Sequence, residues 1–250
     1  MEEKCRLAAR WLKQARFALA LTGAGISVPS GIPDFRSPGG LWSKFDPWEV
    51  CSDYALKFNP KGVWEFLGEA VLLFKQARPN PAHFALAELE ARGILKAIIT
   101  QNIDGLHQEA GSKEVIEFHG GVNRFYCNLC GLEYPREKAF SLKKEELPWL
   151  CSKCQGVIRP DVVFFGEAIP TKALYLSQDL SRKADLMLVI GTSGEVAPAN
   201  TLPSMVKARG GKVIEINLGP SAYEGVSDLK IARGAEEVLP QIVSFLEEEK

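Results

Sequence analysis

Four cysteines form two pairs with the same internal spacing. Cys127 and Cys130 enclose two residues, Cys151 and Cys154 do the same, and twenty residues separate the pairs. Each pair presents two thiolates from one tight turn, and four thiolates complete the tetrahedral sulfur shell that structural Zn²⁺ prefers. Iron is the competing metal, and four unrelated core cysteines are the alternative to any metal. Because a closed shell leaves no position for water, the spacing predicts one structural zinc ion that takes no part in catalysis.

Short sequences with polar side chains follow several apolar runs. They are Gln101, Asn102, Ile103 and Asp104 after 94–100, His119 after 115–118, Gly191, Thr192 and Ser193 after 185–190, and Asn217 after 212–216. Parallel strands bring their carboxyl ends to one edge of a sheet, where such sheets bind ligands. A single His after a strand is more often a structural residue than a base. Four such ends at one edge nevertheless predict a binding site.

A glycine-rich turn, Gly23-Ala24-Gly25, follows the first apolar run. A strand that enters a Gly-x-Gly turn before a helix lets backbone N–H groups approach a pyrophosphate. Val28 stands where the usual pattern has a third glycine, so the turn alone is a partial fingerprint. Residues 29–37 then combine prolines, an acid, an aromatic and an arginine, which predicts a structured loop that folds over a cofactor or lies on the surface.

The elements that must position these residues alternate in type. Apolar runs at 17–22, 94–100, 115–118, 185–191, 212–217 and 228–232 predict strands, and amphipathic stretches at 2–15, 81–92, 172–184, 198–209 and 235–248 predict helices. This alternation is typical of a doubly wound parallel α/β sheet. Residues 43–79 and 123–156 interrupt it, the first with helical spacing and the second with turns and the four cysteines. We expect both to form a smaller module beside the sheet.

Composition restricts the class of protein. The 250 residues include 46% hydrophobic residues and carry a net charge of −1, which excludes wholesale disorder, collagen and disulfide scaffolds. Near-neutral charge gives no general attraction to nucleic acid or membranes. Glutamates around the cysteines also offset the basic residues there: Glu133, Glu137, Glu145 and Glu146. With neither a signal peptide nor a long apolar segment, we expect a cytoplasmic protein without nucleic-acid or membrane partners, for which a monomer is plausible.

Taken in order, these motifs resemble those of the sirtuin family. They are GAGISVPSGIPDFRS, TQNIDGLH, HG at a strand end, the paired CxxC motifs, GTS and a later IN, and they cover roughly residues 17–235. Sirtuins are NAD-dependent protein lysine deacylases. The resemblance implies an α/β fold with a Rossmann-like doubly wound parallel sheet and a smaller discontinuous domain made of a helical module and a zinc ribbon. The large domain would take residues 1–42, 80–122 and 157–250, the helical module 43–79 and the zinc-binding module 123–156.

The resemblance also implies where NAD binds. The pyrophosphate would lie against Gly23, Ala24 and Gly25, and a mobile loop would contain Asp34, Phe35 and Arg36. The nicotinamide pocket would be formed by Asn102, Ile103 and Asp104 beside Gln101. The phosphate and ribose region would be bound by Gly191, Thr192 and Ser193, the adenosine ribose by Asn217 and the adenine by Ala235. Dehydrogenases, which use NAD for hydride transfer, usually have an acidic residue at the adenosine ribose. The asparagine at this position agrees with an enzyme that consumes NAD instead.

Asn102 and His119 are the catalytic residues that the resemblance implies. Departure of nicotinamide leaves positive charge on the ribose, which the acyl oxygen of the substrate lysine attacks. His119 would then act as general base through the ribose hydroxyls, because an ordinary imidazole pKa of about 6.5 keeps the neutral form available. The enzyme would thus be a transferase that moves the acyl group to ADP-ribose, releasing nicotinamide, free lysine and O-acyl-ADP-ribose.

Acetylated-lysine proteins or peptides are the implied substrates. Val163, Phe164, Phe165, Gly166 and Glu167 resemble the family strand that pairs with the peptide, and Gly194, Glu195 and Val196 would supply the opposite edge. Such pairing uses main-chain hydrogen bonds and gives little side-chain selectivity. Gly194 and Glu195 depart from the more apolar residues often found there, so sequence preference does not carry over from the family.

The acyl group is restricted by two positions in the helical module. Family members that remove succinyl or malonyl groups carry a Tyr and an Arg three residues apart, where this chain has Leu67 and Ala70. Without an arginine, a dicarboxylic acyl chain would bury an uncompensated charge. The sequence therefore predicts removal of acetyl and of longer apolar acyl groups.

Two other functions use the same site. A mono-ADP-ribosyltransferase would transfer the activated ribose to a protein side chain, and a non-catalytic sensor would bind NAD or ADP-ribose. Asn102, Asp104 and His119 together argue against the sensor, because nucleotide binding alone does not need them.

Overall fold

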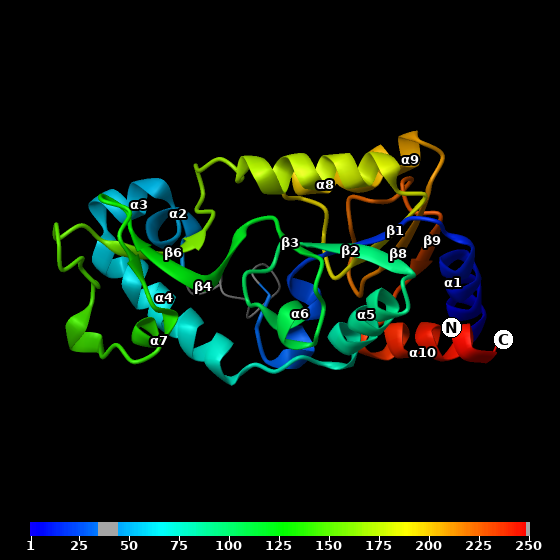
Figure 1. The fold of residues 1–250 in the computed structure, drawn as a ribbon, viewed down its shortest axis with the longest axis horizontal. Helices are drawn as coiled ribbons and strands as arrows, with labels where there is room; N and C mark the ends of the chain where they lie inside the picture. Colours follow the sequence, from blue (N-terminus) through cyan, green and yellow to red (C-terminus); the bar gives the residue numbers. More distant parts are fainter. Residues whose placement is uncertain (35–44, 249–250) are drawn as a thin grey trace.

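The computed structural model describes residues 1–34 and 45–248, and a six-stranded parallel sheet lies at the centre of its larger part (Figure 1). Its strands, in spatial order, are β3 (Val115–Glu117), β2 (Leu95–Thr100), β1 (Ala18–Thr22), β7 (Leu186–Ile190), β8 (Lys212–Ile216) and β9 (Leu229–Ile231). The order runs outward from β1 to β3 and then restarts beside β1 with β7, which is the doubly wound arrangement. All six predicted strands are confirmed.

Helices cover both faces of this sheet. On one face α1 (Glu2–Gln14), α5 (Pro81–Ala91) and α10 (Ala235–Glu248) share an apolar cluster with the strands, and on the other α8 (Thr171–Lys183) and α9 (Leu202–Ala208) do so (Figure 1). Because both faces are covered, every residue of β1 and β7 is buried, which explains their unbroken apolar runs. The five predicted helices are confirmed. Among the described residues, no helix is long and apolar enough to cross a membrane.

A second, antiparallel sheet lies at the other end of the molecule (Figure 1). It consists of β5 (Glu133–Tyr134), β4 (Gly120–Cys127) and β6 (Ile158–Val162), and short helix α7 (Arg136–Ala139) follows β5. Helices α2 (Pro47–Val50), α3 (Asp53–Phe58) and α4 (Pro60–Gln76) lie beside it. Trp64 of α4 packs against Phe125 and Trp149, and its indole N–H donates to Ile158 O at 2.8 Å. The interrupting segments therefore form a separate small module, as the sequence predicts.

Two details of the small sheet differ from the sequence-based expectation. Strand β6 ends at Val162, so residues 163–167 follow a strand and do not form one, apart from a single bridge between Phe165 and Ser52. Strands β4 and β6 also pair with each other, although the proposed division at 122 and 157 runs through β4 and assigns β6 to the large domain. The domain boundaries themselves stay predictions.

Candidate active site

The loops after β1 and β7 meet where the strand order reverses. The Gly23 N–H donates to Ile190 O at 3.0 Å, and the Gly25 N–H donates to Gly191 O at 2.9 Å. A Cβ atom on Gly25 would lie 2.8 Å from the Gly191 Cα, so only glycine permits so close an approach of the two backbones. The glycines of the turn therefore have a packing role at the edge where the sequence predicts a pyrophosphate.

The turn does not lead into a full helix. Two short 3₁₀ turns follow it, Ala24–Ile26 and Val28–Ser30, so little helix dipole is available to attract a phosphate. Among the described residues, the Ala24 N–H is the one amide of the turn without a protein acceptor. The Ala24 N–H is thus the one donor of the turn that could bind the predicted phosphate, which stays a prediction.

Asn102 and Asp104 come together through Ser27. The Asn102 Nδ2 donates to Gly23 O at 3.1 Å and to Ser27 Oγ at 3.2 Å, and Ser27 Oγ donates to Asp104 Oδ2 at 2.7 Å. Burial raises the pKa of Asp104, although the Leu106 N–H and the Ser27 hydroxyl oppose this shift. Ser27 is a site residue that was not predicted; its one signal in the sequence is a hydroxyl beside the glycine turn.

A line of buried polar groups continues behind Asn102. The Asn102 N–H donates to Thr100 Oγ1 at 3.1 Å, and the Thr22 hydroxyl donates to the same oxygen at 2.9 Å. The His107 Nε2 lies 2.9 Å from Thr22 Oγ1 and must carry its proton there, since the Thr22 hydrogen is already donated. Burial lowers the pKa of His107 to about 3 and that of the adjacent His83 to about 4, so both rings are neutral. The sequence assigned none of these four residues a role: Thr100 and His107 stand at the two ends of the TQNIDGLH motif, and Thr22 and His83 lie outside any motif.

His119 lies between β3 and β4, at the junction of the two sheets. Its Nδ1 is 3.0 Å from Gln101 O, and since a carbonyl only accepts, Nδ1 is protonated and Nε2 is the free base. Burial lowers the pKa of His119, and the bond to Gln101 O only partly opposes this. Gln101 also donates from Nε2 to Thr192 Oγ1 at 3.1 Å, which joins the loops after β2 and β7. The structure therefore places a neutral imidazole beside the Asn102 loop.

The remaining predicted NAD contacts spread along the same edge. The Ala222 N–H donates to Ser193 O at 2.7 Å, and the Asn217 Nδ2 donates to Gly219 O at 3.2 Å. Ala235 is the first residue of α10 and is only 6% exposed, within the apolar cluster. Asp34 is half-buried, whereas Phe35 and Arg36 lie outside the described residues. Ile103 packs against the apolar cluster of the small module.

Most backbone donors of residues 163–167 are already paired. Val163 N–H donates to His119 O at 2.8 Å, Phe165 N–H to Cys51 O at 2.9 Å, and Glu167 N–H to Phe164 O at 3.0 Å. The Phe164 N–H donates to the Glu167 carboxylate at 2.9 Å, and the Phe164 ring is buried in the small module. Within the described chain, Gly166 keeps the unpaired N–H of this segment. Among the backbone donors of this segment, the Gly166 N–H is therefore the one that a peptide strand could use.

The predicted opposite edge follows the β7 loop. Gly194 has a φ of +74°, and a Cβ there would lie 2.8 Å from the Tyr223 ring, so this position requires glycine. Glu195 is exposed, and Val196 O accepts the Asn200 N–H at 3.0 Å. The pairing of these residues with a peptide stays a prediction.

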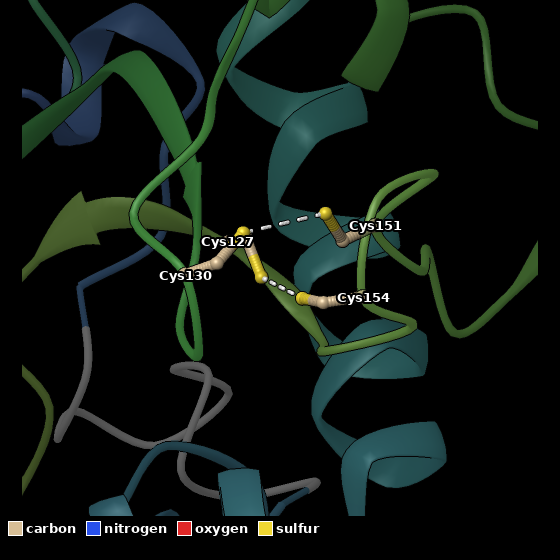
Figure 2. A group of neighbouring side chains, drawn as sticks. All are labelled: Cys127, Cys130, Cys151 and Cys154. Atoms are coloured by element: carbon tan, nitrogen blue, oxygen red, sulfur yellow. Dashed lines mark hydrogen bonds between the residues drawn. The ribbon is translucent and has the colours of Figure 1, made fainter.

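The four cysteines converge from two turns of the small module (Figure 2). Their sulfur atoms all lie within 4.8 Å of one another, with Cys127 and Cys154 at 3.5 Å and Cys130 and Cys151 at 3.7 Å. Cys127 and Cys151 are buried, whereas Cys130 is exposed. Four convergent thiols are the donor set of a closed tetrahedral zinc site, so the residues present fit one structural Zn²⁺.

Neighbouring donors favour thiolates in this cluster. The Leu129 N–H donates to Cys127 Sγ and the Lys153 N–H to Cys151 Sγ, each at 3.4 Å. The Tyr134 hydroxyl donates to Cys151 Sγ at 3.2 Å, and this hydrogen bond lowers the pKa of that thiol. Donors that stabilise the thiolate also orient a metal ligand.

Comparison with known proteins agrees with this arrangement. Residues 23–198 match the model of the Sir2 family. The chain is 50% identical over 235 residues to an NAD-dependent protein deacylase of Pyrococcus furiosus, covering 93% of this chain and 94% of that protein. It is 47% identical over 240 residues to an NAD-dependent protein deacetylase of Caldivirga maquilingensis, covering 96% and 92% of the two chains.

Solved structures agree as well. A Sir2 structure with a p53 peptide and NAD⁺ has a TM-score of 0.87 and 40% identity, and the match covers 95% of this chain and 96% of that one. Extensive identity over nearly the whole length, together with the family match, shows common ancestry and a common fold. The chain belongs to the Sir2 family, whose members are called sirtuins.

Proposed function

We propose that this protein is an NAD-dependent protein lysine deacetylase. One observation supports this most: the loops after β1, β2 and β3 bring together the Asn102–Ser27–Asp104 cluster and a neutral His119 with a free Nε2. Its relatives from Pyrococcus furiosus and Caldivirga maquilingensis are a deacylase and a deacetylase that depend on NAD. Bound NAD supplies an electrophilic ribose carbon once nicotinamide leaves.

Each residue has a distinct task in this reaction. Asn102 and Asp104 hold the nicotinamide end, since their side chains are fixed to each other through Ser27. His119 accepts a proton at Nε2 because its Nδ1–H is committed to Gln101 O. The Ala24 N–H would hold the pyrophosphate, and the Gly166 N–H would pair with the main chain of the peptide, since neither has an acceptor among the described residues. The four cysteines would hold a structural zinc ion, which would cross-link the small module beside these groups.

The acyl preference follows from the helical module. Leu67 and Ala70 are both buried on α4, among apolar neighbours. A dicarboxylic acyl chain would meet no cation at either position, and burying its charge would be costly. The enzyme therefore removes acetyl and longer apolar acyl groups in preference to succinyl or malonyl groups.

Product analysis tests the proposal. Purified protein is incubated with NAD and matched peptides that carry acetyl-lysine or succinyl-lysine, and all products are weighed by mass spectrometry. We expect free lysine peptide, nicotinamide and O-acetyl-ADP-ribose from the acetylated peptide, and much less product from the succinylated one. Equal rates on both peptides would contradict the acyl preference.

The same spectra separate the alternative functions. A mono-ADP-ribosyltransferase would add ADP-ribose to protein without removing acetyl groups, and an NAD sensor would bind NAD without forming any product. A cytoplasmic location, a monomeric state and the lack of nucleic-acid partners stay predictions for this chain.

A further inference from the structure

A buried ion pair joins the start of β6 to the segment predicted to receive the peptide. Arg159 is only 2% exposed, and its guanidinium binds both carboxylate oxygens of Glu167, with Nη2 at 2.7 Å from Oε2 and Nη1 against Oε1. The guanidinium also lies 4.3 Å from the centre of the Phe164 ring and 5.7 Å from that of Tyr126. This is a two-pronged charge-assisted contact in an apolar setting, a geometry that lysine cannot reproduce.

The pair closes residues 162–167 into one fixed loop. Arg159 Nη2 donates to Val162 O at 2.5 Å, and the Glu167 carboxylate accepts the Phe164 N–H at 2.9 Å. The Glu167 N–H returns to Phe164 O at 3.0 Å. Burial raises the pKa of Glu167, but Arg159 and the Phe164 N–H lower it more, so the carboxylate stays charged. Both ends of the loop are therefore held by the same two side chains.

Stability alone does not explain such a pair. Desolvation of two charges offsets most of their attraction, and apolar residues of similar size often stabilise a protein equally well. What the pair provides is a fixed orientation of the backbone N–H groups of the loop. With Phe164 and Glu167 engaged in this way, Gly166 is the one backbone donor of the loop with no acceptor among the described residues, while Val163 N–H is bonded to His119 O at 2.8 Å. The loop thus connects the peptide-facing backbone directly to the proposed base.

We propose that Arg159 and Glu167 are positioning residues for the acylated peptide. They hold the loop so that Gly166 faces the peptide main chain and so that the bond between Val163 and His119 is kept. This inference rests on the proposed function. It predicts that weakening the pair impairs peptide binding and leaves NAD binding intact.

The decisive variant is Glu167→Gln. Glutamine keeps an acceptor for Phe164 N–H but loses the charged two-pronged contact, so the loop loosens without losing its packing. Loss of a charge-assisted hydrogen bond predicts a KM for acetyl-lysine peptide that is about tenfold or more higher. The Kd for NAD, measured without peptide, and the zinc content are expected to stay at wild-type values. Arg159→Lys keeps the positive charge but loses the two-pronged contact with Glu167, so its peptide KM is expected to lie between those of wild type and Glu167→Gln.

Asp185→Asn is the matched control. Asp185 is another carboxylate that accepts backbone N–H groups, from Arg16 at 3.0 Å and Phe17 at 2.9 Å, and pairs with an arginine, Arg16, at 3.4 Å. It precedes β7 and so lies at the opposite edge of the sheet from the site. We expect this substitution to lower the melting temperature and to leave the peptide KM unchanged.

Direct binding of a fluorescent acetyl-lysine peptide separates this proposal from the proposed function. A wild-type protein that binds the peptide but does not deacetylate it would overturn the proposed function, and the Glu167→Gln comparison would still test the loop by binding. The positioning role is overturned if Glu167→Gln binds the peptide as well as wild type, if it weakens NAD and peptide binding equally, or if wild type binds no acetylated peptide.

Discussion

The two sheets hold their functional residues in different ways. In the six-stranded sheet, β1 and β7 are buried throughout, and the loops at their carboxyl ends are tied together by backbone hydrogen bonds. In the three-stranded sheet, β5 has only two residues, and four thiols that converge from two turns supply the cross-link. Apolar burial positions the first region, whereas the second combines an apolar cluster around Trp64 with four thiols that fit a metal cross-link.

The two regions are therefore expected to respond differently to substitutions. Substitutions at the carboxyl edge of the six-stranded sheet are expected to stop the reaction without unfolding the small module. Damage to the cysteine cluster is expected to unfold the small module and to spare the nucleotide end. His119 and residues 163–167 lie between the two sheets and depend on both.

Loss of zinc is the largest expected effect. Cys151→Ser removes a buried ligand, and since structural zinc sites in small peptides contribute roughly 10–16 kcal/mol, the small module is expected to unfold. Peptide binding is then lost, while NAD still binds to the parallel sheet. Hydrogen exchange and NAD calorimetry check this, with Cys5→Ala as a control that removes a buried cysteine outside the cluster. Simultaneous loss of both sheets would refute the separation.

His119→Ala is expected to lower kcat by about 10²- to 10⁴-fold, the usual contribution of a general base. The side chain is half-buried and its loss removes one bond to Gln101 O, so folding and zinc content are expected to be retained. Steady-state kinetics and metal analysis measure both. A variant with more than a tenth of wild-type kcat would show that another group accepts the proton.

The pH profile gives an independent check on His119. Because burial lowers its pKa, the neutral form persists to a pH below the ordinary value of about 6.5. We therefore expect the acid limb of kcat/KM to have an apparent pKa below 6.5. A limb above that value would show that the pKa of His119 is not lowered, or that another group limits the rate at low pH.

Mild acid is expected to weaken the parallel-sheet region. His83 and His107 have pKa values of about 4 and about 3 in the folded protein, against about 6.5 when unfolded. Below pH 6.5 only the unfolded chain takes up these protons, so the free energy of unfolding falls, by about 2 kcal/mol per imidazole at pH 5. Urea unfolding of wild type and His107→Gln at pH 7 and pH 5 measures this. Equal pH dependence in both proteins would contradict a neutral buried His107.

Thr100→Val is the smallest expected effect. The substitution keeps the shape of the side chain and removes the oxygen that accepts the Asn102 N–H and the Thr22 hydroxyl. Leaving these buried donors unpaired costs about 1–3 kcal/mol. We expect weaker inhibition by nicotinamide, with an unchanged peptide Kd. Unchanged nicotinamide inhibition would mean that this polar line is structural only.

The features that were predicted from sequence are those with local signals. The strands β1 and β7 are apolar runs because they are buried on both faces, and the cysteine pairs show their spacing within four residues. The edge that carries Asn102, His119 and Thr192 followed from the rule that parallel strands bind ligands at their carboxyl ends.

Features that depend on long-range pairing were not predicted. Strands β4 and β6 meet although some thirty residues separate them, and no periodicity reveals that partner. Thr22 and Thr100 pair across neighbouring strands, and Arg159 joins Glu167 only once the loop between them has folded. The residue types at these positions do not reveal with which residues the side chains pair.

The most direct test of this account is the peptide dependence of nicotinamide release. Wild-type protein is given NAD alone, and then NAD with an acetyl-lysine peptide, and free nicotinamide is measured in both cases. The account predicts that NAD binds in both, that nicotinamide is released only when the peptide is present, and that each nicotinamide is matched by one deacetylated lysine. Release at the same rate without peptide, or release without loss of acetyl groups, would contradict it.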